Sequence, residues 1–367
     1  PTQVDVCTVK GIPFYAILDD SEEASGTILT RLMLFRDGHS FSNDRGCVEK
    51  TGTDQVRNQF MNPKIAGVYT NSSKNDGKST YHVYVSYYDK YTQCLKYGKY
   101  EFADKLDGNE SAELVSRVTA FSNDSIVIDG KDSIDGTDVG QWSDIKVVNS
   151  VNGPLPIIVY YESTGTSRGN LKFAKGTTTA PDGTKTGENK EWDYTTVTNP
   201  TGVRDFGRYV SMEMDASGGF HVVCQDAISG VLYYGYFASI SESPTGGWKK
   251  VDATSSVGRW TDIKLANPTK SGLAAEPVVT YMDGSKLDTT YAVKVAYMTD
   301  STNCIWDSET DPAEYAANSQ YKMSIVSEAL DLDGKTNKLA VGINSSMLAV
   351  DFLRGEDDLS EKSLATE

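Results

Sequence analysis

The chain has few of the residues that build metal centres and redox sites. Its 367 residues include only three histidines and five cysteines, and no two cysteines form a C-x-x-C pair. The cysteines are Cys7, Cys47, Cys94, Cys224 and Cys304. An odd, scattered set supports neither a zinc site nor a disulfide framework. No HExxH motif is present, which argues against a histidine metal centre.

The chain also lacks basic clusters and long apolar runs. Thirty-five Lys and Arg stand against 51 Asp and Glu, which gives a net charge of -16. Nucleic acid and anionic membrane surfaces attract clustered basic residues, so neither is expected as a partner. No apolar run approaches the ~18–20 residues of a membrane-spanning helix, and no signal peptide is present. Because the chain opens on Pro1 rather than Met, we expect it to be a trimmed part of an exported protein, located outside the cell, at its surface or in the periplasm.

What the sequence does contain is a strand-sized phrase that recurs along the chain. Each copy is an apolar, β-branched and aromatic run that ends on an acid at the same offset. The copies cover residues 13–19, 83–89, 156–162, 220–226 and 277–283. Their terminal acids are Asp19, Asp89, Glu162, Asp226 and Asp283. Self-similarity at a spacing of tens of residues indicates a repeat architecture.

Other phrases accompany each copy. A phrase of the form Gly-x-aromatic-x-Asp/Ser-apolar precedes each copy. A short apolar phrase whose fourth residue is small follows the copy, and a variable segment comes after that phrase. The first phrase covers residues 140–145, 207–212 and 258–263, and the small-residue phrase covers 95–98, 171–174, 232–235 and 293–296. The variable segments include 125–128, 192–196, 248–251 and 321–325. Each unit therefore predicts four short antiparallel strands joined by polar turns.

Such a sheet has two apolar faces, and radial packing of several sheets covers both. The prediction is an all-β fold, a β-propeller of four-stranded antiparallel blades, at residues 1–354, with a charged tail at 355–367. We count five units and an incomplete sixth at 339–351. Six blades are favoured, five remain an alternative, and seven would require a blade hidden in residues 100–140.

These phrases resemble the degenerate repeats of bacterial surface and secreted β-propellers, over residues 3–300. They are also broadly similar to sialidase-type propellers, but no intact S-x-D-x-G-x-x-W box is present. The nearest approaches, at 182–192 and 243–248, have the wrong spacing. The resemblance implies the fold and an exported protein.

Three sets of residues are candidates for chemistry. The terminal acids could act in pairs in glycoside hydrolysis, but their presence in every unit favours a turn-forming role. A second set lies within the glycine phrase and could line a channel with aromatic platforms that suit sugars. The favoured interpretation is that its polar groups satisfy backbone groups between blades. This set comprises Trp142, Asp144, Tyr209, Ser211, Trp260 and Asp262.

The third set consists of two Asp-rich loops that could bind calcium. Neither loop matches the EF-hand spacing, and turn-forming Asp-Gly pairs are the favoured explanation of both. Their acids are Asp129, Asp132, Asp135, Asp331 and Asp333. Calcium is the sole cofactor considered, and no catalytic residue is assigned. The sequence therefore predicts a non-enzymatic binding module for a glycan or a protein partner. The alternative is a glycoside hydrolase or lyase that uses the acids at the strand ends.

Overall fold

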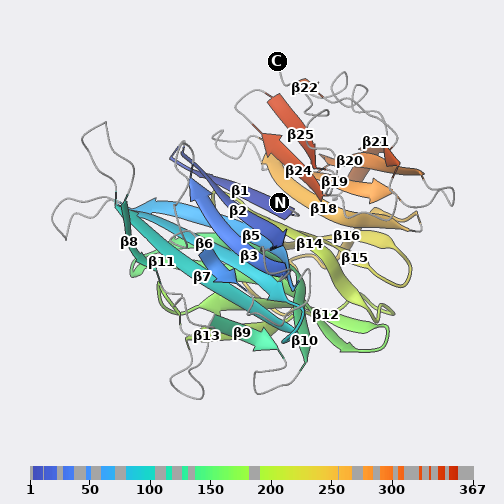
Figure 1. Cartoon of the computed structure of the whole chain (residues 1–367). Coiled ribbons are helices and arrows are strands. Elements are labelled where there is room, and N and C mark those ends of the chain that lie inside the picture. The colour runs from blue at the N-terminus through green and yellow to red at the C-terminus, as the bar shows by residue number, and fades with distance from the viewer. Residues whose placement is uncertain are drawn as a thin grey trace. The chain divides into compact units, whose positions relative to one another are not determined.

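The structure is a computed structural model of the chain. It describes residues 3–10, 12–22, 28–36, 47–50, 59–70, 80–103, 113–117, 126–130, 137–181, 191–254, 256–266, 276–283, 290–300, 305–309, 322–324, 330–331, 338–343 and 347–353. All described elements are β-strands (Figure 1). This agrees with a chain rich in Val, Tyr and Thr, which favour the pleated strand surface. Within these residues, no helix is long and apolar enough to cross a membrane.

The chain divides into two compact units. Unit 1 comprises residues 1–164 and 172–195, and unit 2 comprises residues 165–171 and 196–367. The division passes through β12 and cuts the last residues of β11 and β13, so the third sheet contributes residues to both units.

The first three sheets follow the chain in order, each a path of consecutive strands. Sheet 1 contains β1 (Gln3–Val9), β2 (Ile12–Glu22), β3 (Ile28–Arg36) and β4 (Cys47–Lys50). Sheet 2 contains β5 (Phe60–Thr70), β6 (Thr80–Asp89), β7 (Cys94–Ala103), β8 (Glu113–Arg117) and β9 (Ile126–Gly130). Sheet 3 contains β10 (Asp138–Ser150), β11 (Gly153–Gly165), β12 (Arg168–Gly176) and β13 (Trp192–Thr196).

The remaining sheets belong to unit 2. Sheet 4 contains β14 (Phe206–Met214), β15 (Phe220–Asp226), β16 (Val231–Phe237) and β17 (Lys249–Asp252). Sheet 5 contains β18 (Val257–Ala266), β19 (Glu276–Asp283), β20 (Thr290–Asp300), β21 (Ile305–Glu309) and β23 (Leu330–Asp331). Sheet 6 contains β22 (Lys322–Ser324), β24 (Lys338–Ile343) and β25 (Met347–Leu353).

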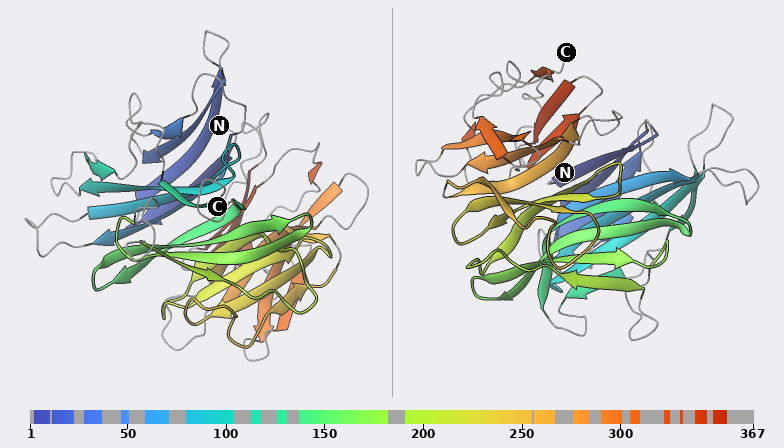
Figure 2. Two further views of the ribbon diagram at one scale, coloured as in Figure 1. Left: turned by 90° about the horizontal axis from the view of Figure 1, so that it is seen from below. Right: turned by 180° about the vertical axis from the view of Figure 1, so that it is seen from behind.

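Within each unit, neighbouring sheets pack through their first strands. In unit 1, β5 contacts β1 on one side and β10 on the other, and in unit 2, β18 contacts both β14 and β24. Figure 2 shows the yellow and orange sheets of unit 2 layered in this way. Apolar side chains fill the space between successive sheets: Leu18 and Val83 belong to one such cluster, and Val223 and Ile263 to another. Successive four-stranded antiparallel meanders packed through their first strands define the β-propeller class, so the predicted fold class is confirmed.

The five acid-terminated phrases lie in β2, β6, β11, β15 and β19, the second strands, as predicted. The number of six blades is not confirmed. Among the described residues, sheet 6 has three strands, and one of its pairings, β22 with β25, is parallel. The predicted strand at 321–325 is therefore not the fourth strand of sheet 5. That place is taken by β21, which follows β20 directly and pairs with it.

The stretch 100–140 does not form a separate sheet in its described part. Both β8 and β9 pair with β7, so the fourth strand of sheet 2 is divided in two. The predicted tail, residues 355–367, lies outside the described residues.

Candidate functional site

The first strands carry a repeated β-bulge where the Gly-x-aromatic phrase lies. The pairing register shifts between Val139 and Ser143, between Arg208 and Ser211, and between Arg259 and Asp262. Two phrase glycines open the bulges of unit 2, with φ of 112° at Gly207 and 81° at Gly258, a region that suits glycine. A bulge interrupts the alternation of side chains. In the Gly-x-aromatic-x-Asp/Ser phrase, the aromatic residue and the Asp or Ser are two positions apart. Because of the bulge, this spacing alone does not place them on the same face of the strand.

One bulge residue adopts the left-handed conformation in three sheets. It comes two residues after the phrase glycine in β14 and β18, and at the matching position of β5, where no glycine precedes it. These residues are Asn62 (φ 52°), Tyr209 (φ 55°) and Trp260 (φ 52°). Asparagine tolerates this region, but for bulky residues it is an outlier. Tyr209 and Trp260 are thus held in a backbone conformation that their side chains disfavour.

Polar side chains of the first strands bind the backbone of the neighbouring sheet. Asp5 Oδ2 accepts a hydrogen bond from the Ile65 N–H at 2.9 Å, and Ser211 Oγ accepts one from the Ile263 N–H at 3.3 Å. Ser211 Oγ also donates to Asp262 Oδ1 at 3.2 Å. In each pair, a side chain of one first strand accepts a hydrogen bond from a backbone N–H that follows the bulge of the next first strand.

The predicted channel residues fall into two groups. Tyr209 and Trp260 are both half-buried, and their rings lie 5.1 Å apart at 58°. Thr261 donates its hydroxyl proton to the Tyr209 carbonyl and so joins the two bulges. Ser211 and Asp262 lie beside this pair. Trp142 and Asp144 belong to unit 1, where Trp142 packs edge-on against Tyr161 at 5.4 Å and Asp144 accepts from its neighbour's N–H at 2.8 Å.

The acids at the ends of the second strands make bonds within their own turns. Asp89 Oδ1 accepts from the Tyr91 N–H at 2.9 Å and from Gln59 Nε2 at 3.1 Å. Asp226 accepts from the Ile228 N–H at 3.0 Å and from Ser229 Oγ at 2.5 Å. This geometry supports the turn-forming interpretation for these two acids. The side chain of Asp19 lies outside the described ones.

Three of these acids also bind a lysine from the third strand. Asp89 binds Lys96 at 2.6 Å, Glu162 binds Lys172 at 3.1 Å, and Asp283 binds Lys294 at 2.9 Å. The sequence carries a signal for this pairing, because all three lysines are the second residue of the small-residue phrase. This pairing was not predicted, because a single charged side chain in a strand ordinarily lies in solvent.

In unit 1 the lysine joins two sheets. Lys172 Nζ lies 2.6 Å from Asp129 Oδ2, and Asp129 is on β9 of sheet 2. Tyr160 donates to the same oxygen at 2.7 Å. We call Asp129, Tyr160, Glu162 and Lys172 the Lys172 cluster. Burial alone would lower the pKa of Lys172, but the carboxylates of Asp129 and Glu162 outweigh it and raise that pKa above its ordinary value. The lysine therefore stays charged.

Unit 2 repeats the arrangement with different residues. Lys294 Nζ lies 3.1 Å from Asp252 Oδ2 on β17 of sheet 4, and Tyr281 donates to the same oxygen at 2.8 Å. We call Asp252, Tyr281, Asp283 and Lys294 the Lys294 cluster. Burial would raise the pKa of Asp252, but bonds from Thr254 and Tyr281 and the charge of Lys294 lower it. Each cluster is a buried ion group between adjacent sheets.

Asp129 is the one calcium candidate whose side chain lies among the described residues. Asp129 is a member of the Lys172 cluster, where its partner is an ammonium group. Asp132, Asp135 and Asp333, and the side chain of Asp331, lie outside the described parts. Among the residues whose positions are described, no group of three or more His, Cys, Asp or Glu could hold a metal ion.

His221, a buried histidine in sheet 4, makes the stability of the folded chain depend on pH. His221 Nδ1 lies 2.8 Å from the Tyr234 hydroxyl, and Nε2 lies 3.5 Å from Asp215 Oδ2. Burial lowers the pKa of His221, and Asp215 offsets this only in part. The unfolded chain therefore takes up this proton more readily than the folded one. The contribution is fully present above the unfolded pKa of about 6.5 and is lost as pH falls below it.

We expect His221→Gln to flatten the pH dependence of stability between about pH 5 and 7. Urea unfolding at several pH values in this window measures it. Asp215 does not change its charge within this pH window. Although burial would raise its pKa, hydrogen bonds from Ser217 and Gly219 in its turn lower it. An equal slope in both proteins would contradict the prediction.

The comparisons with known proteins are consistent with the fold alone. No family model and no curated protein matches the chain. Among solved structures, the chain is similar to the crystal structure of an exo-1,5-alpha-L-arabinanase from a bovine ruminal metagenomic library. The identity is 9%, the match covers 83% of this chain and 95% of that chain, and the TM-score is 0.34. A likeness this distant carries no argument about function.

Proposed function

We propose that the chain is a non-enzymatic binding module of an exported protein and that it recognises a glycan. The binding surface is the Tyr209–Trp260 pair on the first strands of unit 2. A protein partner and a glycoside hydrolase or lyase activity are the alternatives. The sequence resembles the degenerate repeats of bacterial surface and secreted β-propellers. These are exported proteins, which supports the proposal.

The observation that carries the proposal is backbone strain at two aromatic residues. A left-handed conformation costs a bulky residue about 1–3 kcal/mol, and such strain gathers at functional sites. The matching position in β5 is Asn62, which meets the same backbone requirement at little cost. Packing of the fold therefore does not require an aromatic residue there. Half-buried, tilted rings provide the apolar faces on which sugar rings stack.

The carboxylates support binding over hydrolysis. A catalytic acid needs a pKa raised toward neutrality, through burial or a neighbouring like charge. Asp89, Glu162 and Asp283 instead each lie within 3.1 Å of a lysine ammonium group and are held in ion pairs. These acids therefore suit the joining of sheets better than proton transfer.

Trp260→Asn tests the proposal, because it reproduces what β5 already has. We expect the variant to be as stable as the parent, since relief of strain offsets the loss of the ring contact. We expect its affinity for the glycan that the parent binds on an array to fall at least about tenfold, because an aromatic anchor contributes about 2 kcal/mol.

Tyr91→Asn is the matched control. Tyr91 is 70% exposed on the β6–β7 turn of unit 1 and is not part of the proposed surface. We expect its binding to equal that of the parent. Full binding by Trp260→Asn, or loss only in Tyr91→Asn, would overturn the proposed site. If the parent binds no glycan but captures a protein, the ligand class is wrong.

A further inference from the structure

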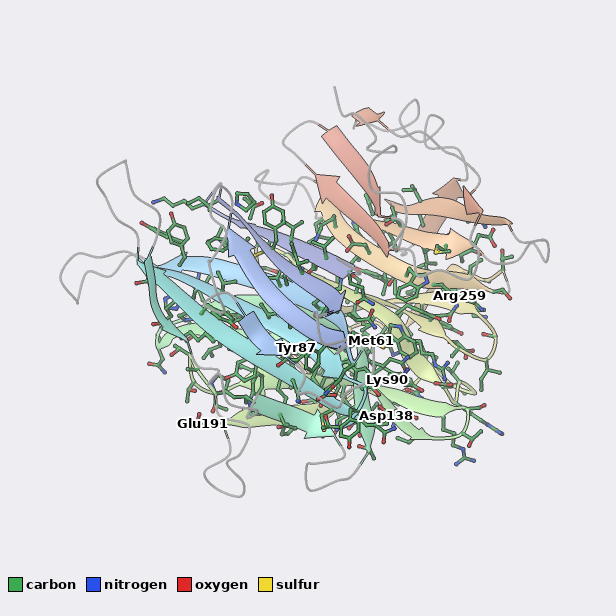
Figure 3. All side chains as sticks on the ribbon, in the orientation of Figure 1. Met61, Tyr87, Lys90, Asp138, Glu191 and Arg259 are labelled. Carbon is green, nitrogen blue, oxygen red and sulfur yellow. The ribbon has the colours of Figure 1, made fainter. Side chains whose placement is uncertain are left out.

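Two arginines occupy the same position in the bulges of sheets 4 and 5. Arg208 directly precedes Tyr209 in β14, and Arg259, which is labelled in Figure 3, directly precedes Trp260 in β18. The pairing register shifts on both sides of each arginine, so each lies within its bulge. A bulge interrupts the alternation that sends neighbouring side chains to opposite faces of a strand. Each arginine is thus the immediate chain neighbour of one ring of the proposed binding surface.

The two arginines differ in their partners. A guanidinium nitrogen of Arg208 lies 2.7 Å from Asp205 Oδ2, and the side chain of Asp205 is only 2% exposed. Three positions before Arg259, where sheet 4 has Asp205, sheet 5 has Ser256. Arg259 therefore lacks the carboxylate that neutralises Arg208.

The other charged side chains of β14 and β18 also have partners. Lys264 Nζ lies 3.0 Å from Glu213 Oε2, and Asp262 accepts a hydrogen bond from Ser211. The guanidinium of Arg259 forms no ion pair or hydrogen bond with the residues that the structure describes, although the residue is half-buried. A partly buried cation is stabilised when an anion pairs with it, and a ligand can supply that anion.

We infer that the bound glycan carries a carboxylate, as a hexuronic acid does, and that Arg259 binds this group while a sugar ring stacks on Trp260. The inference rests on the proposed function, because the stacking surface is the same. A guanidinium presents its N–H groups in a planar fork that matches both oxygens of a carboxylate. One fixed cation suffices for one carboxylate, so a chain without basic clusters and with a net charge of -16 can bind such a sugar.

Matched sugars on a glycan array test the ligand class. The array carries hexuronate oligosaccharides, the same oligosaccharides after reduction of their carboxyl groups, and sulfated neutral oligosaccharides. We expect the parent to bind hexuronates at least about tenfold more tightly than their reduced forms, because hydrogen bonds to charged groups are the stronger ones. Equal binding of the reduced forms, or binding of the sulfated sugars alone, would overturn the inference and leave glycan recognition standing. An array on which no sugar binds would reject the proposed function, and the inference with it.

Substitutions at two positions test the role of Arg259. We expect Arg259→Gln and Ser256→Asp each to abolish the preference for hexuronates, the first by removing the cation and the second by neutralising it, as Asp205 neutralises Arg208. Ser256→Asn is the matched control, because it adds a side chain of the same shape without charge. Both Asp and Asn tolerate the φ of 66° at Ser256. A preference that persists in Arg259→Gln, or that disappears equally in Ser256→Asn, would overturn the inference.

Discussion

Replacing Lys172 by methionine is expected to lower the free energy of unfolding by about 3–5 kcal/mol. The side chains of Lys172 and Asp129 are only 8% and 6% exposed, so the substitution leaves Asp129 and Glu162 charged, buried and without their cation. The desolvation cost of two unpaired carboxylates then falls on the folded state. Urea unfolding at pH 7, followed by circular dichroism, measures the loss.

A triple variant separates the missing charge from the missing packing. In Lys172→Met with Asp129→Asn and Glu162→Gln, no buried charge remains, and the Asn carbonyl still accepts from Tyr160. We expect most of the stability to return, because neutral replacement of a buried ion group is often tolerated. A triple variant as unstable as Lys172→Met would show that the cluster acts through packing.

The second large effect is expected at Trp192. This side chain is 1% exposed, lies in the core between sheets 2 and 3, and packs edge-on against Tyr97 at 5.1 Å. Trp192→Ala removes the largest group of this cluster, and we expect a loss of about 3–5 kcal/mol. The same urea unfolding experiment measures it.

Trp192→Phe is the control for this prediction. The indole N–H of Trp192 is buried and has no hydrogen-bond partner. Phenylalanine keeps much of the ring and removes this unpaired donor, so we expect a loss of only about 1–2 kcal/mol. Equal losses from both substitutions would contradict a role based on volume.

The strands were predictable because their signal is local. The acid-terminated phrase is an apolar, β-branched and aromatic run that ends at a turn, and its five copies lie in the second strands of sheets 1 to 5. The prediction of the fourth strand of sheet 5 at residues 321–325 was wrong, because residues 305–309 and 321–325 carry similar short apolar patterns. Only the pairing with β20 separates them, and that pairing is a long-range property.

The candidate site was predictable only in part. The phrase pointed to Tyr209 and Trp260, but local periodicity does not reveal which residue of a strand adopts a left-handed conformation. The lysine clusters were missed for a related reason. Lys172 and Asp129 are 43 residues apart, and their contact depends on how one sheet packs on the next. The contact of Tyr88 on β6 with Asp138 on β10, labelled in Figure 3, depends on sheet packing in the same way: the Tyr88 hydroxyl donates to Asp138 at 2.8 Å.

The central claim is that the recurring carboxylates hold sheets and turns together and do not catalyse. Its most direct test is sugar release from a panel of polysaccharides by the parent chain, Glu162→Gln and Asp226→Asn. The account predicts no turnover above background by any of the three. Turnover by the parent that disappears in either variant would contradict the claim and establish a hydrolase or lyase.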